Sequence, residues 1–430
     1  MILGGDKEDS SSAQSTASPP SFGPAVRVNN NAANDQGAPS IARVPGQEPF
    51  VAWQDSRSGN QDLYATKSQD NGTSFEVDTR VDDSVGISAQ IEPSVAVSSN
   101  GTIMLVWQDN RRTTFDYDIY FTKSNDGGKT FWPNVKVDDS NETISWQERP
   151  SIAVTDNGVI YVAWMDDRSG HIRIRGAFST DNGMTFSSSK EIAPSDGTNA
   201  QSGVQLAVHG NKIFAAFIDN PSGITHPYLA YSIDGGTTFS SPLRLDNTDS
   251  SGASQRDIAI ASLPDGGLAA IWGDTRSGNL DIYGCFVSAS GVVGASNYRV
   301  DDDTSGAAQE TPCLASDQNG NLYAAWEDER NSLFAIRFTY LQSGRTQYSA
   351  STPVAIPGGN DIQRRPSITA VTPGHVFVAW QDDKAGTDDV YSAAGTVPSL
   401  VVALPELTGI LIPIVAIIAV VLISRRRLEH

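Results

Sequence analysis

The sequence predicts an all-β fold, a seven-bladed β-propeller, followed by one C-terminal transmembrane helix. Three observations predict this architecture. A strand motif recurs seven times at a nearly constant spacing, each repeat unit holds four short strand patterns, and an uncharged apolar segment precedes C-terminal arginines. Repetition of this kind explains the length as one body, the predicted propeller domain 25–396.

The repeat is marked by an aromatic residue two positions before an aspartate, at the end of a predicted strand. Successive aromatic residues lie 54, 57, 53, 55, 54 and 54 positions apart. A glutamine before the first apolar run of each unit keeps the same spacing. The motifs are Trp53/Asp55, Trp107/Asp109, Trp164/Asp166, Phe217/Asp219, Trp272/Asp274, Trp326/Asp328 and Trp380/Asp382, and the glutamines are Gln36, Gln90, Gln147, Gln201, Gln255, Gln309 and Gln363. Two independent markers therefore agree on seven units.

Each unit reads as four strands joined by short turns. One such sheet cannot bury both of its faces, whereas sheets stacked around an axis cover one another, which is the propeller arrangement. The seventh unit lacks a fourth strand, and Ala25-Val26-Arg27-Val28 at the start of the domain has the pattern of one. We therefore expect the N-terminal strand to complete the last blade and close the ring.

The two ends of the chain differ from the repeat. Residues 1–24 are polar and without periodicity, which predicts a flexible tether, and 397–406 form a linker. Residues 407–424 carry no charge and are near the lower length limit for a transmembrane helix, although a buried core helix is an alternative. The basic tail 425–430 predicts a cytoplasmic C-terminus and a propeller held outside, at the cell surface.

Composition narrows the function. The formal charge of −20 disfavours nucleic acid as a partner, because binding a polyanion relies on clustered Lys and Arg. The two cysteines, Cys285 and Cys313, lie in strand patterns and are interpreted as buried thiols. No metal-ligand spacing or Gly-rich phosphate loop is present, so no cofactor is predicted apart from a possible Ca²⁺.

A Ser-x-Asp-x-Gly-x-Ser/Thr-Phe motif stands between the third and fourth strands of units one to four. Its aspartates are Asp70, Asp126, Asp181 and Asp234. The motif resembles the Asp-box, or BNR repeat, of the sialidase (neuraminidase) superfamily, with Phe in the place of the usual Trp. Because Asp and Ser can bond turn amides and Gly accepts positive φ, we interpret these aspartates as structural. The resemblance implies that these turns lie opposite the active-site face.

The C-terminus carries a second resemblance. Leu404-Pro405-Glu406-Leu407-Thr408-Gly409, the apolar segment and the arginines together are similar to the tripartite sorting signals of surface proteins. The arrangement implies membrane anchoring, with or without later processing.

Acidic and basic residues are expected together on the face opposite the Asp-boxes. Asp-x-Arg pairs in most units indicate cross-links between loops, with a binding role as the alternative. Carboxylate runs between blades are weak candidates for Ca²⁺, which prefers oxygen ligands. These candidates are Asp82, Asp83, Asp138, Asp139, Asp301, Asp302 and Asp303.

The mouth of the central channel is the predicted ligand site, because the positions just after the seven glutamines differ between units. The candidate ligand-binding residues are Arg149, Arg256, Arg364, Arg365, Glu92, Glu148, Asp257 and Glu310. Arg149, Arg256 and Arg365 could converge on a carboxylate or sulfate of an acidic sugar. The alternative is that these charges only solvate a channel rim.

The sequence favours a binding protein over an enzyme. Sialidases carry a Phe/Tyr-Arg-Ile-Pro motif, which is absent here, so no catalytic residue is assigned. We therefore expect a surface propeller that binds a glycan or another protein. A sialidase-like exo-glycosidase acting on acidic sugars and a structural envelope protein are the alternatives.

Overall fold

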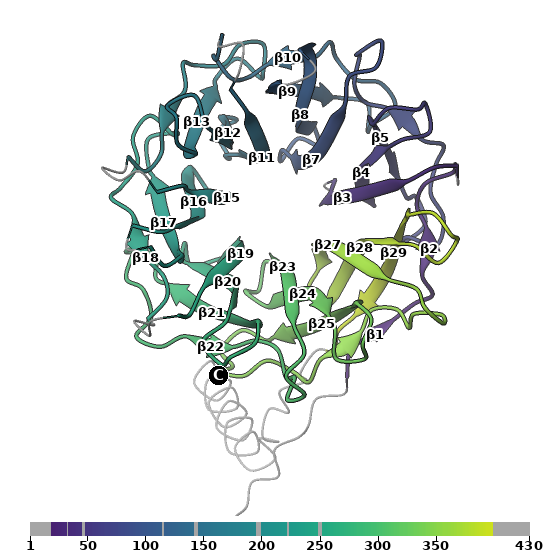
Figure 1. Ribbon diagram of the computed structural model, residues 1–430, viewed down its shortest axis with the longest axis vertical. Coiled ribbons are helices and arrows are strands. Elements are labelled where there is room, and N and C mark those ends of the chain that lie inside the picture. The colour runs from purple at the N-terminus through teal and green to yellow at the C-terminus, as the bar shows by residue number, and fades with distance from the viewer. Residues whose placement is uncertain are drawn as a thin grey trace, which may run out of the picture. The chain divides into compact units, whose positions relative to one another are not determined.

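The computed structural model describes residues 19–398 except 32, 45–47, 114–115, 142–144, 195–198, 222 and 248–251. Over these residues seven antiparallel sheets stand around a central opening (Figure 1). Six sheets have four strands and one has five. The predicted seven-bladed propeller is confirmed.

Within each blade the strands follow one another from the channel outward. The innermost strands are β3 (Gln36–Arg43), β7 (Gln90–Val97), β11 (Gln147–Val154), β15 (Ser202–His209), β19 (Gln255–Ser262), β23 (Gln309–Ser316) and β27 (Gln363–Thr372). The second strands are β4 (Pro49–Asp55), β8 (Ile103–Thr113), β12 (Ile160–Asp166), β16 (Lys212–Asp219), β20 (Leu268–Asp274), β24 (Leu322–Asp328) and β28 (His375–Asp382).

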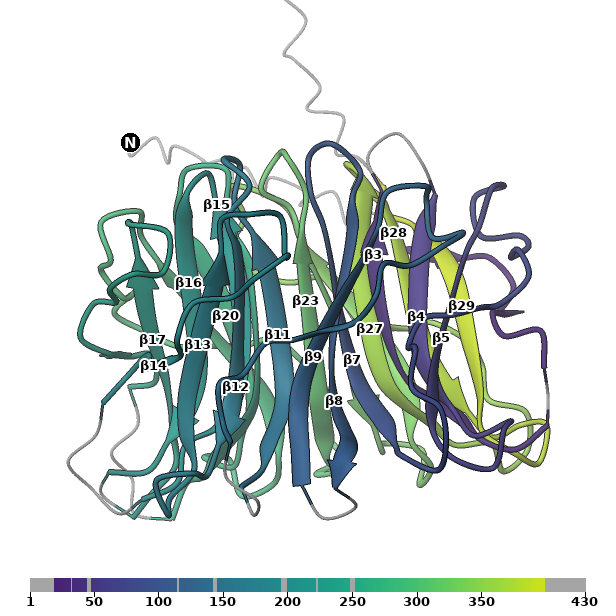
Figure 2. The same ribbon diagram turned by 90° about the horizontal axis from the view of Figure 1, so that it is seen from above.

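The third strands are β5 (Asp62–Lys67), β9 (Asp116–Ser124), β13 (Arg173–Ser179), β17 (His226–Ser232), β21 (Asp281–Val287), β25 (Ala335–Leu341) and β29 (Asp389–Thr396). The outer strands are β6 (Thr79–Arg80), β10 (Val135–Lys136), β14 (Lys190–Glu191), β18 (Leu243–Arg244), β22 (Tyr298–Arg299), β26 (Thr352–Pro353) and, in the last blade, β1 (Ser21–Phe22) and β2 (Val26–Arg27). All strands run between the two faces of the ring (Figure 2).

The core lies between neighbouring blades. The second strands are apolar over nearly their whole length because a blade covers each of their two faces. The six motif tryptophans are fully buried. Trp107 of blade two, for example, belongs to the same buried cluster as Phe50 and Ala52 of blade one. Packing of each sheet on the next therefore holds the ring together. Cys285 is buried and Cys313 is half-buried, and both are free thiols.

The predicted closure is confirmed. Strand β2 pairs antiparallel with β29, so that Val26 faces Ser392 and Arg27 faces Tyr391. The predicted start of the domain is late, because Ser21 and Phe22 of the expected tether also pair with β29. Phe22 then packs on Phe338 with ring centroids 5.1 Å apart, which fixes this segment to blade six.

The predicted anchor lies outside the described residues, as do residues 1–18 of the tether and the basic tail 425–430. Between residues 19 and 398, apart from the gaps given above, the structure shows no helix long and apolar enough to cross a bilayer.

The two faces of the ring carry different loops. The loops between second and third strands and those between blades lie on one face, called the channel-mouth face. The hairpins between first and second strands and the Asp-box turns lie on the other, called the Asp-box face.

In the Asp-box of blade four, Asp234 accepts bonds from the Thr238 hydroxyl at 2.7 Å and the Thr238 N–H at 2.9 Å. These bonds lower the pKa of Asp234 to about 2. The same bonding pattern recurs at Asp70, Asp126 and Asp181.

Each Asp-box also packs on the preceding blade. Gly128 has a φ of 87°, and a methyl group added to it would lie 2.7 Å from the Phe50 ring of blade one. The Asp-box ring Phe131 lies 6.5 Å from the same Phe50 ring. The motif is therefore a contact between blades as well as a turn.

Replacing Gly128 with alanine should lower the free energy of unfolding by about 2–3 kcal/mol, because left-handed strain and the clash with Phe50 add. Gly170→Ala is the matched control, since Gly170 has a φ of 84° and nothing within 4 Å of the added methyl. It should cost about 1 kcal/mol, for strain alone. Urea denaturation measures both, and equal costs would contradict the packing role.

Candidate functional site

The channel mouth is built from seven equivalent β-bulges, one at the start of each innermost strand. The pairing register shifts there in every blade, for example between Ile91 and Ser94 and between Glu148 and Ser151. The residue two positions after each glutamine takes a φ between 49° and 60°. These residues are Ala38, Glu92, Arg149, Gly203, Asp257, Thr311 and Arg365. Left-handed strain in non-glycine residues costs about 1–2 kcal/mol each and is common at ligand sites.

A side chain of the preceding blade holds most of these bulges. The bulge N–H of Arg149 donates to Gln108 Oε1 at 2.8 Å, and that of Arg365 donates to Glu327 Oε1 at 2.8 Å. The corresponding positions before Asp257 and Thr311 are Ile218 and Gly273, which carry no side-chain acceptor. The bulges of blades five and six therefore lack this hydrogen bond to a side chain of the preceding blade.

The structure pairs several of the predicted charges. Arg365 and Glu92 form an ion pair at 2.6 Å, and Arg256 and Glu310 form one at 2.8 Å. The first pair joins blades seven and two. Blade one lies between them, and its bulge residue is the small Ala38. Because two of the three arginines proposed to converge on an acidic sugar already hold carboxylates, the mouth does not present a cluster of three uncompensated cations.

Arg149 is the remaining arginine of the three. Burial raises the pKa of Asp257, and the charges of Arg256 and Arg149 oppose that shift. Burial also raises the pKa of Glu148, again opposed by Arg149. The charge of Arg149 thus acts on two half-buried carboxyl groups. Arg364 points elsewhere, since its guanidinium stacks on Phe334 of blade six at 4.7 Å.

Tyr117 at the start of β9 lies near this group. Burial raises the pKa of Tyr117, and the negative charge of Glu148 adds to the shift. The charge of Glu148 of blade three therefore acts on Tyr117 of blade two. The sequence did not single out Tyr117, because nothing in its own repeat unit points to residues of the next blade.

Trp146 is a second residue that sequence reasoning missed. It is 51% exposed, which is unusual for tryptophan, and it precedes Gln147 directly. The equivalent positions of the other blades are Asp35, Ala89, Ala200, Ser254, Ala308 and Ile362. Trp146 is therefore the single aromatic residue of that ring, and aligning the repeats one position further upstream finds it.

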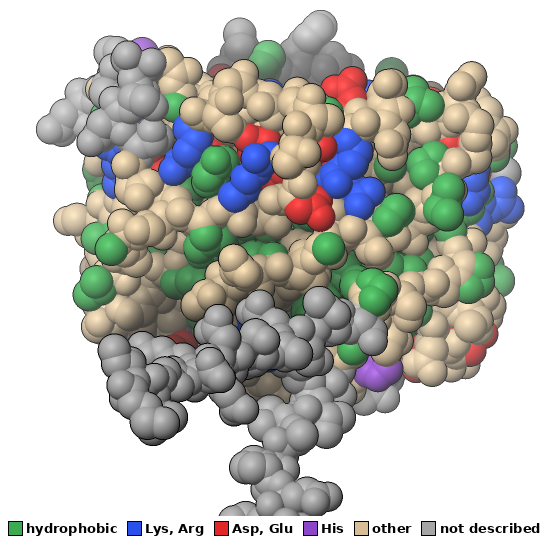
Figure 3. Space-filling model, turned by 90° about the horizontal axis from the view of Figure 1, so that it is seen from below, with side chains coloured by type: hydrophobic (Ala, Val, Ile, Leu, Met, Phe, Trp, Pro, Cys, Tyr) green, Lys and Arg blue, Asp and Glu red, His purple; other side chains and the backbone are tan. Residues whose placement is uncertain are grey.

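The Asp-x-Arg pairs are cross-links between loops, as predicted. Arg111 donates to Asp109 of its own blade at 2.7 Å and reaches Asp83 of blade one at 2.6 Å. Arg168 links Asp166 and Asp139 in the same way. On the outer side of the ring, basic and acidic side chains lie next to one another in a band (Figure 3).

The candidate calcium ligands already accept hydrogen bonds. The first aspartate of each run is buried and bonds a third-strand N–H, as Asp138 bonds Ile119 at 2.9 Å. Burial raises the pKa of Asp138 to about 6. Asp82 and Asp301 repeat this contact.

The second aspartates bind arginines, as Asp302 binds Arg330 at 2.9 Å. Asp303 accepts from Ser305. Within the described ranges, no three His, Cys, Asp or Glu side chains are arranged to hold a metal. Calcium binding stays an untested prediction.

Comparison with known proteins agrees with this architecture. Residues 28–352 match the model of the BNR repeat-like domain family. No curated protein matches the chain.

Solved structures share the fold at low sequence identity. The polysaccharide lyase Uly1 aligns with a TM-score of 0.57 at 12% identity, covering 85% of this chain and 90% of the lyase. An α-L-arabinanase of Penicillium chrysogenum, complexed with arabinobiose, has a TM-score of 0.52 at 12% identity and coverages of 87% and 98%. The Hadza microbial sialidase Hz136 has a TM-score of 0.51 at 15% identity and coverages of 72% and 66%.

Proposed function

Because the chain belongs to the BNR repeat-like domain family, we propose that it is a propeller that binds a glycan at the mouth of its central channel. The observation that carries the proposal is the ring of strained bulges, whose residues change from blade to blade within a constant frame. The left-handed bulge recurs in every blade and is strained in all of them except blade four, where the residue is Gly203. Such a constant frame with side chains that vary is the pattern of a scaffold that presents a ligand site.

The chemistry of the mouth suits sugar hydroxyl groups. Without Arg364, which stacks on Phe334, the predicted residues of the mouth are three arginines and four carboxylic acids, so the mouth has no excess of positive charge. Side-chain exposures of 45% and 31% for Arg365 and Glu92 mean that their ion pair contributes little to stability. A hydroxyl group both donates and accepts, so it can take the place of either partner. We therefore favour a neutral glycan over an acidic one.

Trp146, two residues before Glu148 in the chain, adds an exposed apolar surface. Its exposed ring can pack against the apolar face of a sugar, and binding sites commonly combine such an aromatic surface with a few oriented polar groups. The fold neighbours that act on saccharides, including the arabinanase bound to arabinobiose, support a saccharide rather than a protein as the ligand.

The last strand of the propeller, β29, ends on the Asp-box face. Strand β29 runs from Asp389 at the channel-mouth face to Thr396, and the Val397 N–H bonds Gly374 O at 2.7 Å in a hairpin of the Asp-box face. We propose that the C-terminal segment anchors the protein in a membrane and displays the propeller at the cell surface.

A glycosidase is the second candidate, favoured by the interaction of Tyr117 with Glu148 and by the raised pKa values of Glu148 and Asp257. A carboxyl group whose pKa is raised toward neutrality can act as a general acid on a glycosidic bond.

A glycan array that carries neutral and acidic oligosaccharides tests the proposal. The protein applied to it includes at least residues 19–398. We expect neutral oligosaccharides to be retained, and Arg149→Ala and Trp146→Ala each to weaken binding about tenfold. Arg345→Ala on the Asp-box face is the control and should bind normally. Retention of no glycan, or equal binding by all three variants, would overturn the proposal. Turnover of fluorogenic glycosides that is lost in Glu148→Gln would establish the second candidate instead.

A further inference from the structure

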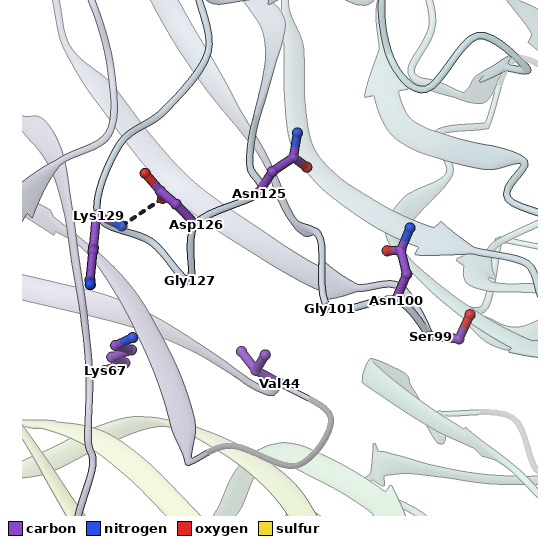
Figure 4. Close-up of a pocket in the computed structure, with 9 residues that line it drawn as sticks. All are labelled: Val44, Lys67, Ser99, Asn100, Gly101, Asn125, Asp126, Gly127 and Lys129. Carbon is purple, nitrogen blue, oxygen red and sulfur yellow. Dashed lines mark hydrogen bonds between the residues drawn. The ribbon is translucent and has the colours of Figure 1, made fainter.

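A second site lies on the Asp-box face, away from the channel mouth. Between blades one and two the surface is hollowed by a cleft of about 400 Å³ (Figure 4). Its walls are the hairpin turn 98–101 between β7 and β8, the Asp-box turn 124–129 of blade two, and Lys67 at the end of β5. We call it the turn cleft.

Two asparagines present donors to the turn cleft. Asn100 Oδ1 accepts the Ser98 hydroxyl at 2.5 Å and the Thr102 N–H at 3.2 Å. Asn125 Oδ1 accepts the Thr102 hydroxyl at 3.1 Å. Because both amide oxygens bond within the protein, the two NH₂ groups are left to donate to a ligand.

Two lysines add positive charge. Lys67 and Lys129 extend into the same part of the cleft (Figure 4). The one acidic side chain of the lining, Asp126, already accepts the Lys129 N–H, the Thr130 N–H and the Thr130 hydroxyl at 2.6–3.0 Å. No carboxylate in the described part of the chain forms an ion pair with either ammonium group. The cleft is therefore a local excess of donors in an acidic protein.

The other Asp-box junctions lack this arrangement. The position of Lys129 is taken by Thr73, Met184 and Thr237 in the other Asp-boxes. Lys123, which corresponds to Lys67 one blade later, donates to Asn182 O at 2.7 Å and stacks on Trp132 at 4.4 Å. Its ammonium group is therefore already engaged. The Asp-box alone does not require the lysine pair, so the pair needs a separate explanation.

We propose that the turn cleft binds an acidic saccharide through a sugar-borne carboxylate or sulfate held between Lys67 and Lys129. Charge-assisted bonds from the ammonium groups would take the oxyanion, and the NH₂ groups of Asn100 and Asn125 would take neighbouring oxygens. The volume is that of a small-ligand site and exceeds what a single sulfate ion fills. This inference is independent of the proposed function, because it concerns the opposite face.

Isothermal titration calorimetry at low salt tests it with four probes: a sulfated disaccharide, a uronate disaccharide, their neutral analogue and sodium sulfate. We expect one or both acidic disaccharides to bind and the affinity to fall as salt is raised. The variant K67A/K129A should bind at least about tenfold more weakly. K190A is the matched control for loss of one exposed lysine and should bind as the native protein does, as should Arg149→Ala at the mouth.

The outcomes separate the possibilities. Equal affinity for the neutral analogue, or an unchanged affinity in K67A/K129A, would overturn the proposal. Sodium sulfate bound as tightly as both disaccharides would reduce the cleft to a site for free ions and would also overturn it. Thermal melting of each variant checks the fold, and the charge-reversing Lys129→Glu gives a second test if the double variant is unstable. Failure here leaves the mouth proposal intact, because Arg149→Ala tests that site separately.

Discussion

Deletion of residues 22–29 is expected to lower the melting temperature by about 10 °C or more. This segment supplies strand β2 and half of β1, so its loss removes the outer edge of the blade that closes the ring. Val28 is fully buried and packs with Trp53 and Val390. Burial of Val28 contributes about 1.5–3 kcal/mol, and the partly buried Phe22 contributes less.

The polar part of the closure is as important as the apolar part. Asn29 Nδ2 donates to Asp389 Oδ1 at 2.7 Å, and Asn29 Oδ1 accepts the Val390 N–H at 2.8 Å. Asp389 is completely buried, so removing Asn29 takes a hydrogen-bond donor from a buried carboxylate. A buried acidic group that loses a partner commonly costs several kcal/mol.

Differential scanning calorimetry measures the effect, and complementation supplies the control. A peptide of residues 19–31 added in excess should restore much of the lost melting temperature, because the closure is a non-covalent pairing with β29. The same peptide with Asn29→Ala should restore less. If the variant without residues 22–29 melts at the same temperature as the native protein, the closure role of this segment is contradicted.

The fold was predictable because its main features are local and repeated. The spacing of Trp-x-Asp motifs and of glutamines follows from packing that every blade repeats. A signal that is weak in one repeat unit therefore becomes clear over seven units. Strand β1 was missed because two residues, Ser21 and Phe22, cannot show a periodicity. Their place is set by pairing with Thr396 and Gly395, which are far away in the sequence.

The candidate site was predictable only in part. Positions counted from the repeated glutamines identified the charged residues of the mouth, because the offset is constant. Their partners were not predictable, since the Arg365–Glu92 pair joins residues 273 positions apart. The left-handed conformation of Glu92 and Arg149 was equally hidden. Neither residue type favours it, and side chains of the preceding blade hold it in place.

The second large effect is expected at Asp109, which tests whether the Asp-x-Arg pairs are structural. Asp109 is fully buried and accepts bonds from Trp107 Nε1 at 3.0 Å, Gln90 Nε2 at 3.1 Å and the guanidinium of Arg111 at 2.7 Å. Asp109→Ala would leave these donors, together with the Arg111 backbone N–H, facing an uncharged methyl group. We expect the free energy of unfolding to fall by about 3–5 kcal/mol, measured by urea denaturation.

Blade four provides the control within the same chain. There the aromatic residue is Phe217, which has no indole N–H, and the residue two after Asp219 is not a cation. Asp219 accepts from Gln201 Nε2 at 2.9 Å and from the Asn220 N–H at 2.7 Å. Asp219→Ala should therefore cost about 1–2 kcal/mol. A binding role for the Asp-x-Arg pairs predicts the opposite pattern, in which Asp109→Ala melts like Asp219→Ala but loses glycan affinity at the mouth. A large stability loss with glycan affinity kept, measured well below the melting temperature, would show that the cross-linked loops hold the mouth in shape without contacting its ligand.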